Sequence, residues 1–363
     1  MGSAVSSDIA VVARRRQRRG GLFLCILAVL LGTAVLASVS HGAVSVSPGQ
    51  VLAILGHQIG IALPWEFGQR EETVLLSIRL PRMLLGLVTG AALAVSGAVL
   101  QGLFRNPLAD PALIGVSTGA ALAAVATIVL GSTLAALLPL GVRPYLLPVA
   151  AFLGGLLVTL LVYRIASRDG QVDVATMLLA GVALNAIASA GIGLMVFIST
   201  DQQLRDLNFW LLGSLGGVTW ATLLPALPLI AAPVLLLPLL WRRLNALLLG
   251  DGQAFHLGFD VERTKRLVVV LAALTAGASV ALTGVIGFVG LVVPHLIRLS
   301  IGPDHRTLLP GAVLLGAALM LIADLFARTV VLPAELPVGV LTAFVGGPFF
   351  LWLLLRGRRT GGW

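Results

Sequence analysis

Long apolar runs alternate with short polar connections along almost the whole chain. A helix needs about 20 apolar residues to cross the hydrocarbon core of a bilayer, because each residue adds about 1.5 Å. The pattern therefore predicts an all-α membrane protein with about ten transmembrane helices, at residues 21–40, 82–104, 112–131, 145–165, 173–199, 221–241, 264–283, 285–300, 308–328 and 337–356.

Composition points to the same class of protein. Apolar residues make up 58% of the chain and charged residues 11%, whereas soluble domains carry about 25% charged residues. We expect residues 1–20 to form an arginine-rich cytoplasmic segment and residues 21–363 to form one transmembrane domain. The single cysteine, Cys25, lies in the first apolar run, so one chain offers neither a disulfide nor a thiolate metal site.

The basic residues occur in short clusters between the apolar runs, which argues against nucleic acid as a partner despite a net charge of +9. If the N-terminus is cytoplasmic, 18 of the 24 arginines and lysines fall on the cytoplasmic side. This bias follows the positive-inside rule and predicts an inner-membrane protein with both termini in the cytoplasm. A signal peptide cleaved near Ala43 also fits the N-terminal pattern, but the nine further spans favour a retained anchor.

Two of the predicted spans contain similar sequences. GAALAVSGAV at 90–99 resembles GASVALTGVI at 277–286, and Pro107 then aligns with Pro294. These spans run in opposite directions in the predicted topology. The similarity therefore indicates an inverted repeat. Many transporters use such a repeat to open a central binding site alternately to the two sides of the membrane.

The chain lacks an energy source of its own. Its only lysine, Lys265, follows Thr264, so no GxxxxGK[ST] phosphate loop is present, and ATP would have to be hydrolysed by a separate subunit. An ion-coupled secondary transporter is the alternative of a different class. That alternative would call for carboxylates within the spans, and this chain offers only Asp173 and Asp324, both near span ends.

Catalytic chemistry has little support in the sequence. His295, Asp304 and His305 are near one another in sequence, but they fall at the inner end of predicted helices. No HExxH pattern occurs, and the single GxSxG match, GVSTG at 115–119, lies inside a predicted span. We therefore expect a non-catalytic protein without a metal site.

Two polar breaks fall on the predicted inner side. The segment 105–111, RNPLADP, contains two prolines that cannot sit inside a helix, and Asn106 and Asp110 suit turns and caps. The segment 167–173, SRDGQVD, is the second break. Such loops could close a pore from the cytoplasm, although ordinary connections would look similar.

The longest inner segment lies between the sixth and seventh predicted spans. Residues 246–262 combine amphipathic spacing with glycines at 250, 252 and 258, which predicts short helices lying across the membrane face. We interpret this stretch as a coupling segment for a soluble partner, and a bare surface loop is the alternative. For a transporter without a nucleotide site, that partner would be the ATPase.

Several ordered motifs together closely resemble the FecCD family of permeases, which includes vitamin B12, ferric siderophore and haem importers. The resemblance runs from about residue 40 to the C-terminus. It rests on RLPR at 79–82, SGAVLQGLFRNPLADPALIGVSTGA at 96–120, LGDGQAFHLG at 249–258, GFVGLVVPHLIR at 287–298, DHRTLLPG at 304–311 and ELPVGVLTAFVGGPFFLWLL at 335–354.

The resemblance implies a type II ABC importer permease: a homodimer of ten-helix subunits with two cytoplasmic ATPases and a periplasmic binding protein. The matching inner gate residues are Asn106, Pro107, Leu108, Ser167, Arg168, Asp169, Gly170, Gln171 and Val172. The helices that seat in the ATPase match Leu249, Gly250, Asp251, Ala254, Phe255, His256, Leu257 and Gly258. The outer arginines that receive glutamates of the binding protein match Arg79, Arg82 and Arg328.

The transported ligand is indicated by a narrower resemblance. The stretch 199–217 looks most like that of haem permeases, with ferric siderophore as the next candidate and cobalamin after it. Arg205 would offer a cation to haem propionates, and Met177 and Met195 would line an apolar pathway. Haem would be the cargo and not a bound cofactor, since a pathway should avoid strong coordination.

Overall fold

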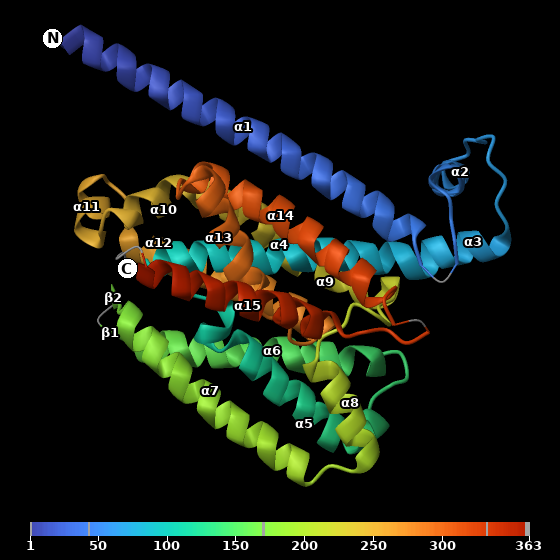
Figure 1. The fold of residues 1–363 in the computed structure, drawn as a ribbon. Coiled ribbons are helices and arrows are strands. Elements are labelled where there is room, and N and C mark those ends of the chain that lie inside the picture. The colour runs from blue at the N-terminus through green and yellow to red at the C-terminus, as the bar shows by residue number, and fades with distance from the viewer. Residues whose placement is uncertain (1, 43, 169–170, 332, 360–363) are drawn as a thin grey trace.

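The computed structural model describes residues 2–42, 44–168, 171–331 and 333–359, which form a bundle of helices (Figure 1). Its long helices are α1 (Gly2–Ser40), α4 (Leu80–Leu103), α5 (Val116–Leu137), α6 (Arg143–Ala166), α7 (Val174–Phe197), α9 (Trp220–Leu236), α12 (Val261–Thr283), α13 (Val289–Ile301), α14 (His305–Ala327) and α15 (Val338–Arg359). Each predicted span coincides with one of these helices.

Shorter elements connect the long helices. They are α2 (Pro48–Gln58), α3 (Gln69–Thr73), the π-helical turn η1 (Val74–Arg79), the 3₁₀ turns η2 (Pro111–Ile114) and η3 (Leu237–Leu240), α8 (Asp201–Leu211), α10 (Trp241–Leu248), α11 (Asp251–His256) and the two-residue strands β1 (Ser167–Arg168) and β2 (Gln171–Val172). Of the helices in the described ranges, seven are long and apolar enough to cross a membrane, and α5, α13 and α15 contain shorter apolar stretches. The all-α membrane fold is therefore confirmed.

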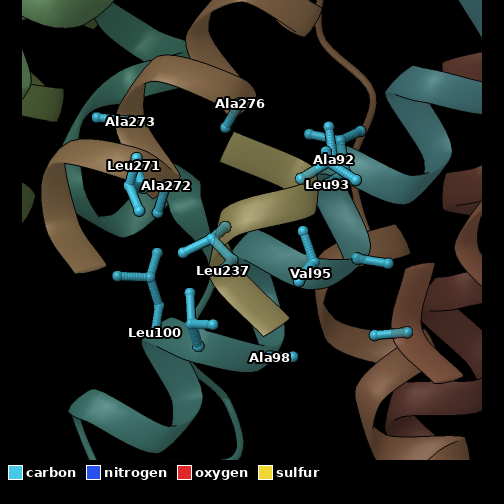
Figure 2. Close-up of a cluster of buried hydrophobic side chains, with 14 of the residues drawn as sticks. Ala92, Leu93, Val95, Ala98, Leu100, Leu237, Leu271, Ala272, Ala273 and Ala276 are labelled. Carbon is cyan, nitrogen blue, oxygen red and sulfur yellow. The ribbon is translucent and has the colours of Figure 1, made fainter. Parts of the chain in front are cut away.

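Helix α4 occupies the centre of the bundle. It packs against α14, α12, α13 and α9, and its neighbours approach closely because small residues lie at the contacts. A Cβ atom at Gly97 would lie 2.0 Å from the carbonyl oxygen of Gly290, and one at Gly90 would lie 2.2 Å from that of Gly316. Figure 2 shows the apolar core beside these contacts, where alanine and leucine side chains of α4 meet those of α12 and η3.

The peripheral helices leave much of their surface uncovered. In the most apolar stretch of α7 only 17% of the residues are buried, and in that of α1 22% are buried. In the most apolar stretch of 69–103, the continuous helix that ends with α4, the share is 83%. Helices α5, α6 and α7 pack together on one side of α4, and α1 runs beside α14 on another (Figure 1). Lipid or another protein chain must cover the uncovered apolar faces.

The two ends of the bundle differ in character. One end carries α11 and the β1–β2 hairpin, and we call it the coupling face; both ends of the described chain lie there too (Figure 1). The opposite end carries α2, α3 and the three predicted outer arginines, and we call it the arginine face. Helix α2 is an element that the hydropathy pattern did not reveal, because at 11 residues it is too short to span a bilayer.

The predicted eighth span, 285–300, is helical only from Val289. Helix α12 ends at Thr283, Gly284 adopts φ 70°, and Phe288 adopts φ 67° before α13 begins. The broken backbone is buried in protein: Ser214 donates its N–H to the carbonyl oxygen of Thr283 at 2.7 Å, and Ile286 is 6% exposed. Non-helical backbone at membrane depth is tolerated under such cover. Whether α4 and α12 are related by an inverted repeat stays a prediction.

Candidate gate and coupling site

The first predicted gate loop is a sharp turn at the end of α4. Asn106 accepts a hydrogen bond at its Oδ1 from the backbone N–H of Leu108 at 2.9 Å, which closes the turn around Pro107. Asp110 caps η2 by accepting from the N–H of Ala112 at 2.9 Å. Arg105 enters the turn with φ 48°, a left-handed conformation that is uncommon outside glycine. The loop is therefore held by its own side chains, as the break in the sequence predicted.

The second predicted gate segment folds as a hairpin. Ser167 pairs with Val172 and Arg168 with Gln171 in an antiparallel register, while Asp169 and Gly170 lie outside the described residues. Two-residue strands are too short to show a period in the sequence, so the strands were not predicted. Asp173 follows the hairpin and caps α7, and the hydrogen bonds that Thr176 donates to its carboxylate lower the pKa of Asp173.

The predicted coupling segment, 246–262, contains the short helix α11 and the last three residues of the short helix α10. Ala254 is fully buried, whereas Leu249, Phe255 and Leu257 are 63%, 70% and 59% exposed. Gly250 and Gly258 bracket α11 with φ values of 117° and 85°. Large apolar side chains that remain exposed at one place mark a docking surface. His256 is also exposed, and its ring contacts that of Phe255 edge to face.

An ionic network joins the coupling segment to both gate segments. Asp251 of α11 forms ion pairs with Arg105, beside the first gate loop, and with Lys265 of α12 at 2.9 Å. Lys265 also donates to the carbonyl oxygen of Val172 at 3.2 Å, and Glu262 accepts from the N–H of Val172 at 2.9 Å. Sequence reasoning did not assign Arg105 or Lys265 to the site, and it included Glu262 only as the last residue of the predicted coupling segment. The one signal in the sequence was that the only lysine of the chain, Lys265, lies at the start of a predicted span.

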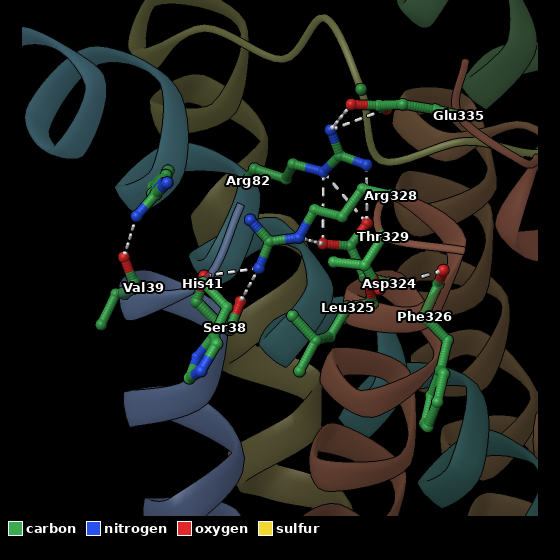
Figure 3. A network of polar contacts seen from close by, with 12 residues as sticks. Ser38, Val39, His41, Arg82, Asp324, Leu325, Phe326, Arg328, Thr329 and Glu335 are labelled. Carbon is green, nitrogen blue, oxygen red and sulfur yellow. Dashed lines mark hydrogen bonds and ion pairs between the residues drawn. The ribbon is translucent and has the colours of Figure 1, made fainter. Parts of the chain in front are cut away.

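The three predicted docking arginines are buried at the arginine face (Figure 3). Arg79 donates to the carbonyl oxygens of Val39 at 2.6 Å and Ser40 at 3.0 Å, at the end of α1. Arg328 donates to the carbonyl oxygen of Ser38. These two guanidinium groups therefore cap α1 in this conformation, and their role in docking stays a prediction.

Arg82 is paired with acidic residues of the same chain. Its Nε and Nη2 donate to Asp324, at 3.0 Å and 2.9 Å from Oδ1, and its Nη1 lies 2.9 Å from Glu335. The side chain of Asp324 is 1% exposed. Asp324, which the sequence places near a span end, is therefore a buried carboxylate, and Arg82 and Arg328 together compensate its charge.

The three predicted pathway residues lie apart from one another. Met177 is fully buried near one end of α7, and Met195 is partly buried near the other, about 27 Å away at 1.5 Å per residue. Arg205 is exposed on α8, where it donates to Gln202 at 2.9 Å. Met177 and Met195 therefore cannot bind one ligand at the same time, and Met177, enclosed in the core, lines no open route in this conformation.

The fold and the polar machinery at its coupling face define a membrane permease. The chain belongs to the FecCD transport family, whose profile matches residues 28–356. It is 49% identical over 340 residues to the hemin transport system permease protein HmuU of Yersinia pestis, a match that covers 93% of this chain and 96% of that one.

Other relatives carry different names. The chain is 44% identical over 330 residues to the cobalamin import system permease protein BtuC of Halobacterium salinarum, covering 90% of this chain and 85% of that one. It is 42% identical over 354 residues to the vitamin B12 import system permease protein BtuC of Escherichia coli, covering 96% and 99%. Among solved structures, an inward-facing metal-chelate type ABC transporter aligns with a TM-score of 0.78 and 33% identity, over 92% of this chain and 98% of that one. The protein is an ABC importer permease.

Proposed function

We propose that this permease carries haem inward across the bacterial inner membrane, with both termini in the cytoplasm. The observation that carries the proposal is the 49% identity to a hemin permease over 93% of the chain, against 42% to 44% for the cobalamin and vitamin B12 permeases. Both ends of the described chain lie at the coupling face, so this proposal puts that face in the cytoplasm (Figure 1). A ferric siderophore or cobalamin remains the alternative cargo, since cobalamin permeases match almost the same length.

Transport would be driven by two ATPase subunits bound at the coupling face. The sequence holds no phosphate loop, and the exposed side chains of Leu249, Phe255 and Leu257 offer an apolar surface to a soluble partner. The permease itself would not be catalytic. Its task would be to convert movement of α10 and α11 into opening and closing of the route.

A second copy of the chain would complete the route. Helix α7 is the least covered of the long apolar helices, and Leu179, Ile187 and Phe197 on it are 72%, 66% and 85% exposed. Two such faces around an axis would enclose a path past Met195 with Arg205 near its mouth, and Met177, which is fully buried, would reach that path only after a change of conformation. The arginine would attract haem propionates, and the apolar walls would let the macrocycle move without strong coordination.

A periplasmic haem-binding protein would dock at the arginine face. Because Arg79, Arg82 and Arg328 are engaged within the chain, a partner carboxylate would have to displace one of their present acceptors or bind beside it. Glu335 is 48% exposed and pairs with Arg82, so it marks the point where a partner could reach that guanidinium. An ion pair at this half-exposed point would contribute about 0 to 1 kcal/mol, so it would set orientation more than affinity.

The test is uptake into liposomes that contain the permease with its ATPase. Haem, a ferric siderophore and cobalamin are offered in parallel, each on its binding protein, with ATP inside the vesicles. We expect accumulation of haem that stops when ATP is withheld. Accumulation of another cargo without haem would refute the haem assignment, and uptake driven by a proton or sodium gradient without ATP would instead establish an ion-coupled carrier.

A further inference from the structure

The carboxylate of Asp251 is a meeting point for three elements of the coupling face. Its Oδ1 pairs with Nη2 of Arg105, which follows α4, and its Oδ2 lies 2.9 Å from Nζ of Lys265 on α12. Asp251 is itself the first residue of α11. Each oxygen of one carboxylate thus holds a different neighbour, and each neighbour belongs to or contacts a different gate segment.

Arg105 connects the coupling helices to the first gate loop. Its Nε donates to the carbonyl oxygen of Leu247 in α10 at 2.9 Å, so the side chain contacts both short helices. Its backbone, in the left-handed conformation, sets the direction in which the loop through Asn106 leaves α4. A shift of α10 and α11 would therefore act directly on the residue that starts the loop.

Lys265 connects α11 to the second gate segment. The three N–H groups of its ammonium find three acceptors: Asp251 and Glu262 at 2.9 Å each and the carbonyl oxygen of Val172 at 3.2 Å. The side chain is only 7% exposed, so the charge cannot turn to water when one acceptor is lost. Glu262 also accepts a hydrogen bond from the N–H of Val172. The end of the hairpin is therefore held through both the N–H and the carbonyl oxygen of Val172.

A cleft of about 1230 Å³ lies between the hairpin and α11. Arg168, Gln171 and Val172 line it on one side, Asp251 and Phe255 line it on the other, and Lys265 lies along its wall. The hairpin and the docking helix face each other across this space. The ionic bridge through Lys265 is therefore the contact by which one can move the other.

We propose that Asp251 is a positioning residue that transmits movement of α11 to both gate segments, through Arg105 to the first loop and through Lys265 to the hairpin. The proposal rests on the proposed function, because it assigns the source of movement to an ATPase bound at α11. Asp251 contacts neither cargo nor nucleotide in this assignment. Its loss should therefore lower the cargo moved per ATP more than it lowers ATP turnover or ATPase affinity.

The experiment uses the complete transporter with Asp251→Asn, Arg105→Gln and Lys265→Met in the permease. Arg263→Gln is the matched control, because Arg263 is an exposed cation two residues from Lys265 and outside the network. Gln171→Cys, made in a Cys25→Ser background, carries a spin label on the exposed hairpin. Three quantities are measured: ATP turnover, cargo moved per ATP, and the distance between the two labels of the dimer with and without ATP.

We expect Asp251→Asn to lose about tenfold in cargo moved per ATP, a larger loss than any it causes in ATP turnover, as a coupling interaction of ordinary strength would give. The change in label distance on ATP addition should disappear, whereas Arg263→Gln should preserve it. Asp251→Glu, which retains the charge, should restore part of the coupling. The label distances test this inference even if the wild type moves no haem, in which case the cargo assignment fails separately.

Three results would overturn the proposal. The first is normal cargo per ATP in Asp251→Asn together with an intact label response. The second is an equal loss in Arg263→Gln, which would point to general charge at this face. The third is loss of ATPase binding on co-purification of Asp251→Asn, which would make Asp251 a docking contact instead.

Discussion

Arg82 and Asp324 are 242 positions apart in the sequence, yet they form a two-pronged ion pair in which the guanidinium donates from Nε and Nη2 at 3.0 Å and 2.9 Å. The pair joins the start of α4 to the end of α14 at the arginine face (Figure 3). Arg328 approaches the same carboxylate from the other side at 3.5 Å. A buried acid shared by two cations is a tertiary anchor, and it fits a structural counter-ion better than a titrating relay for an ion-coupled carrier.

Removing this acid should destabilise the fold. We expect Asp324→Ala to cost about 3 to 5 kcal/mol of unfolding free energy, because it removes the buried carboxylate that compensates the charge of two buried guanidinium groups. The measurement is thermal unfolding in detergent. Glu335→Gln is the control, since that carboxylate is half exposed and its loss should cost no more than about 1 kcal/mol. An equal effect of both variants would contradict the anchor.

Close approach of α4 to α13 should make Gly97 intolerant of a side chain. Gly97→Ala would place its Cβ 2.0 Å from the carbonyl oxygen of Gly290, and backbone atoms cannot rotate away. We expect a loss of about 1 to 3 kcal/mol or more, measured by unfolding in detergent. Gly193→Ala is the control because nothing lies within 4 Å of its added Cβ, and that variant should be neutral or slightly stabilising. A stable Gly97→Ala variant would show that α4 and α13 can separate.

The exposed apolar side chains of the coupling face should carry ATPase affinity. Phe255→Ser should weaken binding by about 2 kcal/mol or more, roughly 30-fold, as aromatic hot spots do. The side chain is 70% exposed, so the permease itself should fold normally. The measurement is co-purification and titration of the ATPase. Phe209→Ser, at an equally exposed phenylalanine of α8, should leave the affinity unchanged, and undiminished binding by Phe255→Ser would place the ATPase elsewhere.

Loss of the Arg205 charge should slow haem uptake but should not abolish it. The guanidinium is exposed, so Arg205→Gln should slow uptake by up to about fivefold, the range of an exposed ion pair. The loss should shrink at high salt because screening weakens such pairs. Met195→Leu preserves volume and should transport at the normal rate. Abolished uptake in Met195→Leu would instead indicate a sulfur ligand to the haem iron.

Hydropathy located the long helices because the length of a single apolar run is enough to predict a span. The prediction does not depend on which other helices pack against it. The same signal overestimated α13, since the apolar residues 285–288 belong to a buried break whose glycine and positive φ values carry no hydropathy mark. Helix α2 was missed for the opposite reason, being short and of mixed polarity.

In the candidate site too, features set by the local sequence could be predicted, and contacts made by the tertiary fold could not. Pro107 and the glycines at 250 and 258 marked the loop and the short helices, because they act on the local backbone. The partners of Asp251 and Arg82 could not be predicted, because each pair joins helices that only the tertiary fold brings together. Burial of Arg79 and Arg328 was hidden for the same reason, since their acceptors are carbonyl oxygens that every residue possesses.

The break between α12 and α13 has a consequence for biogenesis. Peptide groups at membrane depth are unstable in contact with lipid unless other groups bond or cover them. Here the cover comes from the turn after α8, where Ser214 bonds to Thr283, and from Gly339 of α15, packed so closely that a Cβ there would lie 2.8 Å from the carbonyl oxygen of Val285. Because α15 is synthesised after α12 and α13, the seventh and eighth crossings can settle only after α15 has left the ribosome.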